Sequence, residues 1–191
     1  DLRQVIAKRW GVDLHERTVG QLLHRLGFAR LSVRPKHPKA DPAAPAVGLA
    51  PGARWIAARV CLTVDCSESG IIRAAQWMLA PTDLSGQNPR PDLRPHIINN
   101  SWSDGPNNMQ YAGYTAAWRA AGIFPAFAAG NTGSFNKCST IQSPGDYSEV
   151  VGVGAVTRYD QITTFSGVGP SADGRLKPDL TAPGYAVLST V

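Results

Sequence analysis

The chain of 191 residues has no apolar run near the ~20 residues that a membrane-spanning helix requires, so no membrane partner is predicted. It also lacks an initiator methionine and the apolar core of a signal peptide, and we therefore expect an internal fragment whose compartment the sequence does not reveal. Charged residues make up only 17% of the chain, whereas hydrophobic residues make up 43%. This composition and length favour one ordinary globular domain accompanied by a small second one.

Cysteine is scarce as well. The three cysteines, Cys61, Cys66 and Cys138, do not have the spacing of a metal-ligand set. We expect free and mostly buried thiols, with a disulfide between Cys61 and Cys66 as the alternative that the spacing leaves open. The sequence contains no clustered metal ligands and no glycine-rich phosphate loop, so it predicts no metal site and no cofactor.

The positive charge is confined to one end of the chain. Residues 1–42 hold nine of the 19 Lys and Arg residues and four of the 14 Asp and Glu residues, and so account for the whole net charge of +5. This asymmetry predicts an anion-binding segment joined to a neutral globular body. We expect two domains, over residues 1–44 and 45–191.

The first 44 residues show two helical periodicities. The second of them has apolar residues at positions 19, 22, 23 and 26, and Gly27 follows it as a stop signal. Two short amphipathic helices with a tight turn form a helix-turn-helix pattern, which predicts DNA as a partner. A helical hairpin with a solvated basic face is the alternative. In the DNA-binding interpretation, the residues exposed to the groove would be Arg17, Gln21, His24 and Arg25.

Sequence motifs in this segment give evidence beyond its helical periodicity. Residues 22–28 read LLHRLGF and residues 34–41 read RPKHPKAD. Together with residues 11–19 they resemble the winged helix-turn-helix that precedes the catalytic domain of IS630-type transposases. In that family this region contacts DNA, and a separate carboxylate-rich domain performs strand transfer. Nothing downstream resembles that second domain, so transposition is not expected.

Residues 45–191 alternate strand and helix patterns. We expect strands over 55–60, 96–100, 123–129 and 149–156, and helices around 71–78 and over 107–122. The alternation predicts parallel βαβ units with helices on both faces of the sheet. Ligands and catalytic groups are then expected at the carboxyl ends of the strands.

Polar motifs stand at three of these strand ends. Residues 97–103 read IINNSWS, residues 127–133 read FAAGNTG, and residues 164–170 read TFSGVGP and lead to KPDLTAPG. Each is weak alone, because a Gly-Asn-Thr-Gly stretch is more often a turn. In this order, the set resembles the subtilase family across residues ~46–191, nearest to its bacillopeptidase F-like members. The resemblance implies an incomplete doubly wound parallel sheet of subtilisin type, with the small all-α segment ahead of it.

The resemblance also implies residue roles. Asn131 matches the asparagine of the oxyanion hole, whose fixed side-chain amide stabilises the negative oxygen of a tetrahedral acyl intermediate. The segment 101–103 matches the strand that pairs with extended polypeptide substrate, and the family usually has glycine where Ser103 stands. The peptide bond between Ser143 and Pro144 falls where some members have a cis bond. The substrate-binding residues would be Ser101, Trp102, Ser103, Ala129 and Gly130.

The Asp, His and Ser of the family's catalytic triad are not found in these 191 residues. The Asp and His motifs would precede Gly48, and the Ser motif, Gly-Thr-Ser-Met-Ala, would follow Val191. Asp65 resembles the Asp motif faintly but comes too late in the chain, and His96 leads into a strand where the family has no base. We therefore expect a subtilisin-like serine endopeptidase by descent that is inactive alone. It would act on a polypeptide substrate only if the missing catalytic triad were supplied.

Two alternative interpretations of the chain stay open. One is a DNA-binding, transposase-derived module, and the other is an accidental gene fusion with no selected function. Intact subtilases are usually secreted and can bind calcium, so the compartment and any calcium sites stay undetermined for this chain.

Overall fold

The computed structural model describes residues 8, 53–61, 66–134 and 136–187. The chain divides into two compact units, Asp1–Arg34 and Pro35–Val191, and each is considered by itself. All the described residues except one lie in the second unit. The four residues predicted to contact DNA lie outside the described residues: Arg17, Gln21, His24 and Arg25.

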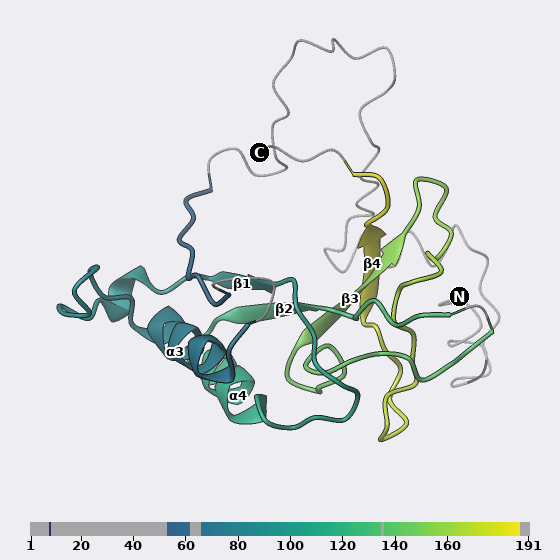
Figure 1. The fold of residues 1–191 in the computed structure, drawn as a ribbon, viewed down its shortest axis with the longest axis horizontal. Helices are drawn as coiled ribbons and strands as arrows, with labels where there is room; N and C mark the ends of the chain where they lie inside the picture. Colours follow the sequence, from purple (N-terminus) through teal and green to yellow (C-terminus); the bar gives the residue numbers. More distant parts are fainter. Residues whose placement is uncertain (1–7, 9–52, 62–65, 135, 188–191) are drawn as a thin grey trace, which may run out of the picture. The chain divides into compact units, whose positions relative to one another are not determined.

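A four-stranded parallel sheet with the order β1-β2-β3-β4 forms the centre of the second unit (Figure 1). Its strands are β1 Ile97–Asn100, β2 Phe124–Ala128, β3 Val151–Val156 and β4 Leu180–Pro183. All three strand pairs are parallel, so the carboxyl ends of the strands lie at one edge. This confirms the predicted parallel α/β sheet, in which β1, β2 and β3 correspond to the expected strands.

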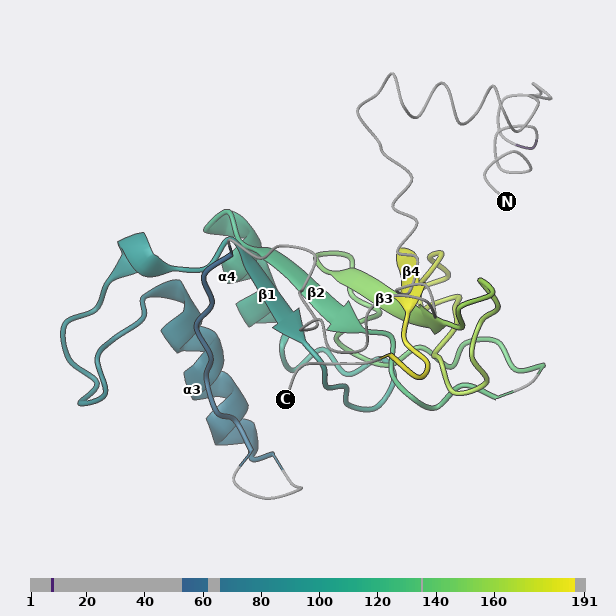
Figure 2. The same cartoon turned by 90° about the horizontal axis from the view of Figure 1, so that it is seen from above.

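Two α-helices, α3 (Glu68–Leu79) and α4 (Ala112–Ala120), lie on the same side of the sheet (Figures 1 and 2), and the 3-10 helix η1 (Pro91–Leu93) lies in the connection between α3 and β1. Ser67 caps α3, because its hydroxyl oxygen accepts a hydrogen bond from the backbone N–H of Gly70. Trp118 Nε1 in α4 donates to the carbonyl oxygen of Ala75 in α3 at 2.9 Å. This bond joins the two helices over the sheet.

Helix α4 is shorter than the predicted helix over 107–122. Asn107 has a left-handed φ of 57°, and the side-chain oxygen of Asn108 accepts a hydrogen bond from the backbone N–H of Gln110. Asparagine favours such local bonds over helical ones, so residues 107–110 are not helical. Gly122, with a φ of 79°, ends the helix at the other side, as expected for a glycine after a helix.

The core of the second unit lies between the helices and one face of the sheet. In β1 and β2 the side chains alternate between buried and exposed, and the buried ones face the helices. Trp118 and Phe127 stack with their ring centroids 6.3 Å apart. The buried core residues are Ala75, Ile98, Tyr111, Trp118, Ile123, Phe127, Tyr147 and Val150.

The opposite face of the sheet is apolar and substantially exposed. Ile97 pairs with Phe124 in the register of β1 and β2, and these side chains are 64% and 42% exposed. Leu180 in β4 is 47% exposed. Parallel sheets are usually covered on both faces, but the two described α-helices cover only one.

Residues 55–60 do not form the strand that their apolar character predicted. Trp55 is 84% exposed, and no ladder joins this segment to the sheet. An apolar run forms a strand only where a neighbouring strand pairs with its backbone groups. The described residue directly after this segment, Cys61, forms an isolated antiparallel bridge with Cys66 and does not extend into a strand.

The cysteines also differ from the expectation of buried, free thiols. Cys61 and Cys66 form a disulfide bond, the alternative that the sequence left open, because the bridge between their backbones places the two side chains together. Cys138 is free, but it is exposed rather than buried. In the described part of the chain, no helix has the length and hydropathy to cross a bilayer.

Candidate functional site at the carboxyl ends of the strands

The candidate site lies where β1 and β2 end. The register pairs Asn100, the last residue of β1, with Phe127 near the end of β2. The segments that follow the two strands, residues 101–103 and 129–131, therefore begin side by side at one edge of the sheet. The structure thus brings the predicted substrate-binding residues and Asn131 to the same edge.

Gly130 forms the turn after β2. Its φ is 91°, a left-handed conformation that glycine adopts without steric cost. A β-carbon at this position would lie 2.4 Å from Oε1 of Gln142, so a larger residue would also collide with that side chain. Two hydrogen bonds fix the backbone here, from Ala129 N to Val153 O and from Gly167 N to Gly130 O. The turn therefore requires glycine.

Asn131 follows this turn and is exposed. The residues after it are held firmly, because Thr132 Oγ1 donates to the carbonyl oxygen of Thr140 at 3.0 Å and Gly133 N donates to that of Phe165 at 2.8 Å. No hydrogen bond to another described residue occupies the side-chain amide of Asn131. Its N–H donors are therefore available on a fixed backbone.

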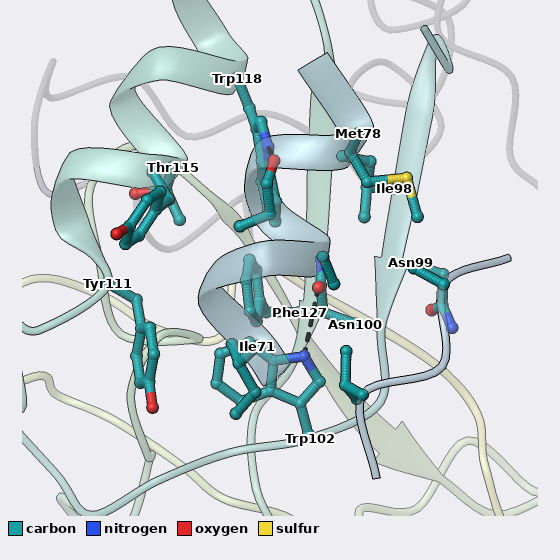
Figure 3. A pocket seen from close by; sticks show the side chains of 15 residues that line it. Ile71, Met78, Ile98, Asn99, Asn100, Trp102, Tyr111, Thr115, Trp118 and Phe127 are labelled. Carbon is teal, nitrogen blue, oxygen red and sulfur yellow. Dashed lines mark hydrogen bonds between the residues drawn. The ribbon is translucent and has the colours of Figure 1, made fainter. Parts of the chain in front are cut away.

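Trp102 turns its indole ring toward the helices (Figure 3). Its Nε1 donates to Oδ1 of Asn100 at 3.3 Å, and its ring packs edge-on against Tyr111 and Phe127 with centroid distances of 5.0 and 5.3 Å. The ring lines a cavity of about 120 Å³ between α3, α4 and the sheet, together with Ile71. Trp102 therefore anchors the segment 101–103 to the core.

Ser101 and Ser103 lie on the exposed side of the same segment. Asn99 Nδ2 donates to Ser101 Oγ at 3.0 Å, and Ser103 Oγ donates to Oε1 of Gln142 at 2.8 Å. Sequence reasoning missed Gln142. Ser103 and Gln142 are 39 positions apart in the sequence, so no local pattern joins them, and only the position of Gln142 just before the Ser143–Pro144 motif pointed to this region.

The segment around Pro144 joins the two strand ends. The bond between Ser143 and Pro144, at a position where the resemblance allowed a cis bond, is cis. Asp104 N donates to the carbonyl oxygen of Ser143 at 2.8 Å, and the Ser143 hydroxyl donates to Asp146 at 2.9 Å. Burial raises the pKa of Tyr147 to about 12, so this phenol stays protonated at neutral pH and donates to the carbonyl oxygen of Asn108.

The described part of the site contains the Asn131 amide and the two segments after β1 and β2. It contains no pair of side chains arranged for proton transfer. His96 is exposed and lies at the amino end of β1, away from the carboxyl ends of the strands. Asp65 lies outside the described residues. Among the described residues, no group of three or more His, Cys, Asp or Glu side chains could hold a metal ion. The arrangement places the side-chain N–H donors of the exposed Asn131 at the same edge of the sheet as the segment 101–103.

A model of the subtilase family matches residues 35–191, and a model of the winged helix-turn helix matches residues 1–46. Bacillopeptidase F of Bacillus subtilis (strain 168) is 39% identical over 148 residues, which cover 76% of this chain and 10% of that protein. Serine protease AprX of the same strain is 40% identical over 80 residues, covering 38% of this chain and 17% of AprX.

Among solved structures, prenylagaramide maturation protease PagA is similar with a TM-score of 0.47 and 19% identity, covering 64% of this chain and 39% of PagA. The chain spans 10% and 17% of the length of the two curated relatives. The family model covers the whole of the second unit, including the polar motifs at its strand ends. The chain belongs to the subtilase family.

Proposed function

We propose that residues 35–191 form the substrate-binding and oxyanion-stabilising part of a subtilisin-like serine endopeptidase. The observation that carries this proposal is the unoccupied amide of Asn131, held just beyond β2 and beside the segment 101–103. The identity to bacillopeptidase F and serine protease AprX of Bacillus subtilis supports the reaction class, which is peptide-bond hydrolysis.

In this reaction a serine oxygen attacks the scissile carbonyl carbon, a histidine accepts the serine proton, and an aspartate orients the histidine. The amide of Asn131 donates a hydrogen bond to the carbonyl oxygen as it becomes negative. The backbone around Asn131 is already fixed, so little reorganisation accompanies the charge change. Loss of such a donor lowers kcat about 10²–10³-fold, a magnitude measured on a subtilisin.

The nucleophile, base and orienting acid come, in this proposal, from sequence outside these 191 residues. We therefore expect that the 191-residue chain alone will not react with a serine-directed phosphonate. A longer polypeptide that contains the Asp, His and Ser motifs should react with the phosphonate and hydrolyse casein. Absence of both activities from the longer polypeptide would contradict the proposal.

Peptide binding tests the part that this chain supplies. The probe is an N-blocked tetra-alanine peptide with a free carboxylate, which resembles a cleavage product and places an anionic oxygen near Asn131. We expect the side-chain amide signals of Asn131 to shift in an NMR titration of the 191-residue chain. Asn131→Asp keeps the shape but replaces the donor with a negative charge that repels the probe's carboxylate, so the affinity should fall at least about tenfold, whereas Gln161→Ala, at an exposed side chain, should change nothing.

A second candidate function is DNA binding through residues 1–44. The winged helix-turn helix match and the concentration of the whole net charge in residues 1–42 favour it. DNA affinity should then fall with rising salt, and Arg17→Ala or Arg25→Ala should each reduce the salt slope by about one. Lys137→Ala, in the second unit, is the control.

An accidental fusion without a selected function is the third possibility, and it predicts neither peptide nor DNA binding. Amplification of source DNA across the codons for residues 36–56 tests it directly. A continuous product supports one gene, and separate recovery of the two flanks supports a false junction.

A further inference from the structure

Residues 53–60 form a strap that passes α3 without belonging to the sheet (Figure 2). The carboxyl end of the strap lies against the first turn of the helix, because a β-carbon on Gly70 would be 2.8 Å from the carbonyl oxygen of Val60. Ala58 and Val60 are half-buried and line the cavity between α3, α4 and the sheet, whereas the other residues of the strap are exposed. The strap is thus one wall of that cavity.

A disulfide bond fastens the strap to α3. Cys61 directly follows the strap, and its partner Cys66 directly precedes Ser67, the residue that caps the helix. The helix keeps its start without the disulfide, since the carbonyl oxygen of Ser67 accepts hydrogen bonds from Gly70 N and Ile71 N at 3.0 and 3.1 Å. The strap lacks such support from the sheet, because no ladder joins the two. Loss of the disulfide should therefore free the strap and leave α3 in place.

The disulfide is accessible to a reductant, because Cys66 is exposed and Cys61 is only half-buried. A thiolate of a dithiol can attack Sγ of Cys66, which breaks the S–S bond and releases Cys61 as a thiolate that takes up a proton. The second thiol of the reductant then displaces the sulfur of Cys66. The dithiol ends as a cyclic disulfide and both cysteines end as thiols, so two electrons and two protons have passed to the protein.

We propose that the disulfide between Cys61 and Cys66 is a redox switch, which holds the strap at the cavity when oxidised and releases it when a dithiol reduces it. The cavity is also lined by Ile71, Met78 and Trp102, so release of the strap gives solvent access to these apolar side chains. Trp102 anchors the segment 101–103 through its ring contacts, and its surroundings change with the strap. The switch needs no substrate, so it does not depend on the proposed peptidase reaction.

The two methionines of the chain can report on the switch by NMR. Met78 lines the cavity, whereas Met109 lies ahead of α4 and is 60% exposed. The full 191-residue chain, labelled with carbon-13 at the methionine methyl groups, is mixed with a neutral gadolinium chelate, and the paramagnetic broadening of each methyl signal is measured before and after reduction by dithiothreitol. Reduction should increase the broadening of the Met78 signal at least about twofold and leave that of Met109 unchanged.

Cysteine variants separate the switch from other effects of the reductant. The double variant Cys61→Ser with Cys66→Ser should show the high Met78 broadening from the start and no response to dithiothreitol. Cys138→Ser removes the free, exposed thiol and should respond like the wild type. If the double variant does not fold, the comparison of the oxidised and reduced wild-type chain still decides.

Two results would overturn the switch. One is a Met78 signal that reduction leaves unchanged, because the strap would then stay in place without the disulfide. The other is an equal increase in the broadening of Met78 and Met109, because the disulfide would then stabilise the whole unit rather than hold the strap.

Discussion

The ammonium group of Lys177 lies 2.6 Å from Oδ2 of Asp179, and the lysine side chain is only 3% exposed. The same ammonium donates to the carbonyl oxygen of Val150 at 3.1 Å, and the same carboxylate oxygen accepts a hydrogen bond from Gly152 N at 2.7 Å. These bonds tie the start of β3 to the segment that enters β4. The Lys-Pro-Asp motif is therefore a strand clamp inside the second unit.

Removal of the buried cation should be costly. Lys177→Met removes the cation from the Val150 carbonyl oxygen and leaves the Asp179 carboxylate with only the bond from Gly152 N, so we expect a loss of about 3 kcal/mol in the free energy of unfolding. Arg90→Met, which breaks an exposed ion pair with Asp92, should cost less than about 1 kcal/mol. Urea unfolding of the two variants compares these costs, and equal losses would refute the clamp.

Tyr147 should limit stability at alkaline pH. Burial raises its pKa from 10.0 to about 12, so the neutral phenol is favoured in the folded state. Its contribution is complete below pH 10 and disappears as the pH rises from 10 to 12. Tyr147→Phe should cost about 1–3 kcal/mol at neutral pH, because Asn108 and Tyr111 lose their partner, and it should flatten the alkaline decline. Thermal melts against pH measure both effects, with the exposed Tyr159→Phe as control.

Asp83 should produce an acid-dependent step in stability. Hydrogen bonds from the Ser85 side chain, from Gln87 N and from the Asn88 side chain lower its pKa from 3.8 to about 2. Since the folded-state pKa is depressed, the stabilisation is present above pH 3.8 and is lost as the pH falls toward 2. Asp83→Asn should remove this step, which denaturation curves over that range can detect. An unchanged acid profile would show that these bonds do not persist in solution.

Gly130→Ala should be destabilising for two separable reasons. The positive φ opposes a β-carbon, and the added methyl group meets Gln142. We expect a loss of about 2–3 kcal/mol, against about 1 kcal/mol for Gly86→Ala, where φ is also positive but nothing lies within 4 Å. The double variant Gly130→Ala with Gln142→Ala removes the contacts with Oε1 and Cγ but keeps the one with Cβ at 2.9 Å, so it should recover part of the difference. Simple additivity of the two single losses would indicate that the side chains do not meet.

Local sequence patterns predicted the helices and strands that are determined mainly by neighbouring residues. Helix α3 follows from its periodic apolar residues, and β2 and β3 follow from short apolar runs. Strand β4 was not predicted, because it is only four residues long and reads Leu-Thr-Ala-Pro. Only Leu180 and Ala182 are apolar residues that can also donate a backbone hydrogen bond. Its pairing with β3 comes from contacts distant in sequence.

The candidate site divides in the same way. Asn131 and the residues after β1 could be placed from motifs, because the order of strands in a parallel sheet determines which ends are adjacent. Gln142 could not, because it reaches Ser103 through the fold. The disulfide between Cys61 and Cys66 and the exposure of Trp55 likewise depend on which backbone segments pair, and composition does not specify that.

The described part of the second unit is amphipathic, because one face of its sheet is apolar and exposed. Helices cover the other face, whereas Ile97, Phe124 and Leu180 present a hydrocarbon surface to solvent. Salts such as ammonium sulfate strengthen apolar contacts, so this side should adsorb to hydrophobic chromatography media at high salt. Recovery of the purified chain should therefore depend on low salt or a mild detergent, which competes for that one surface.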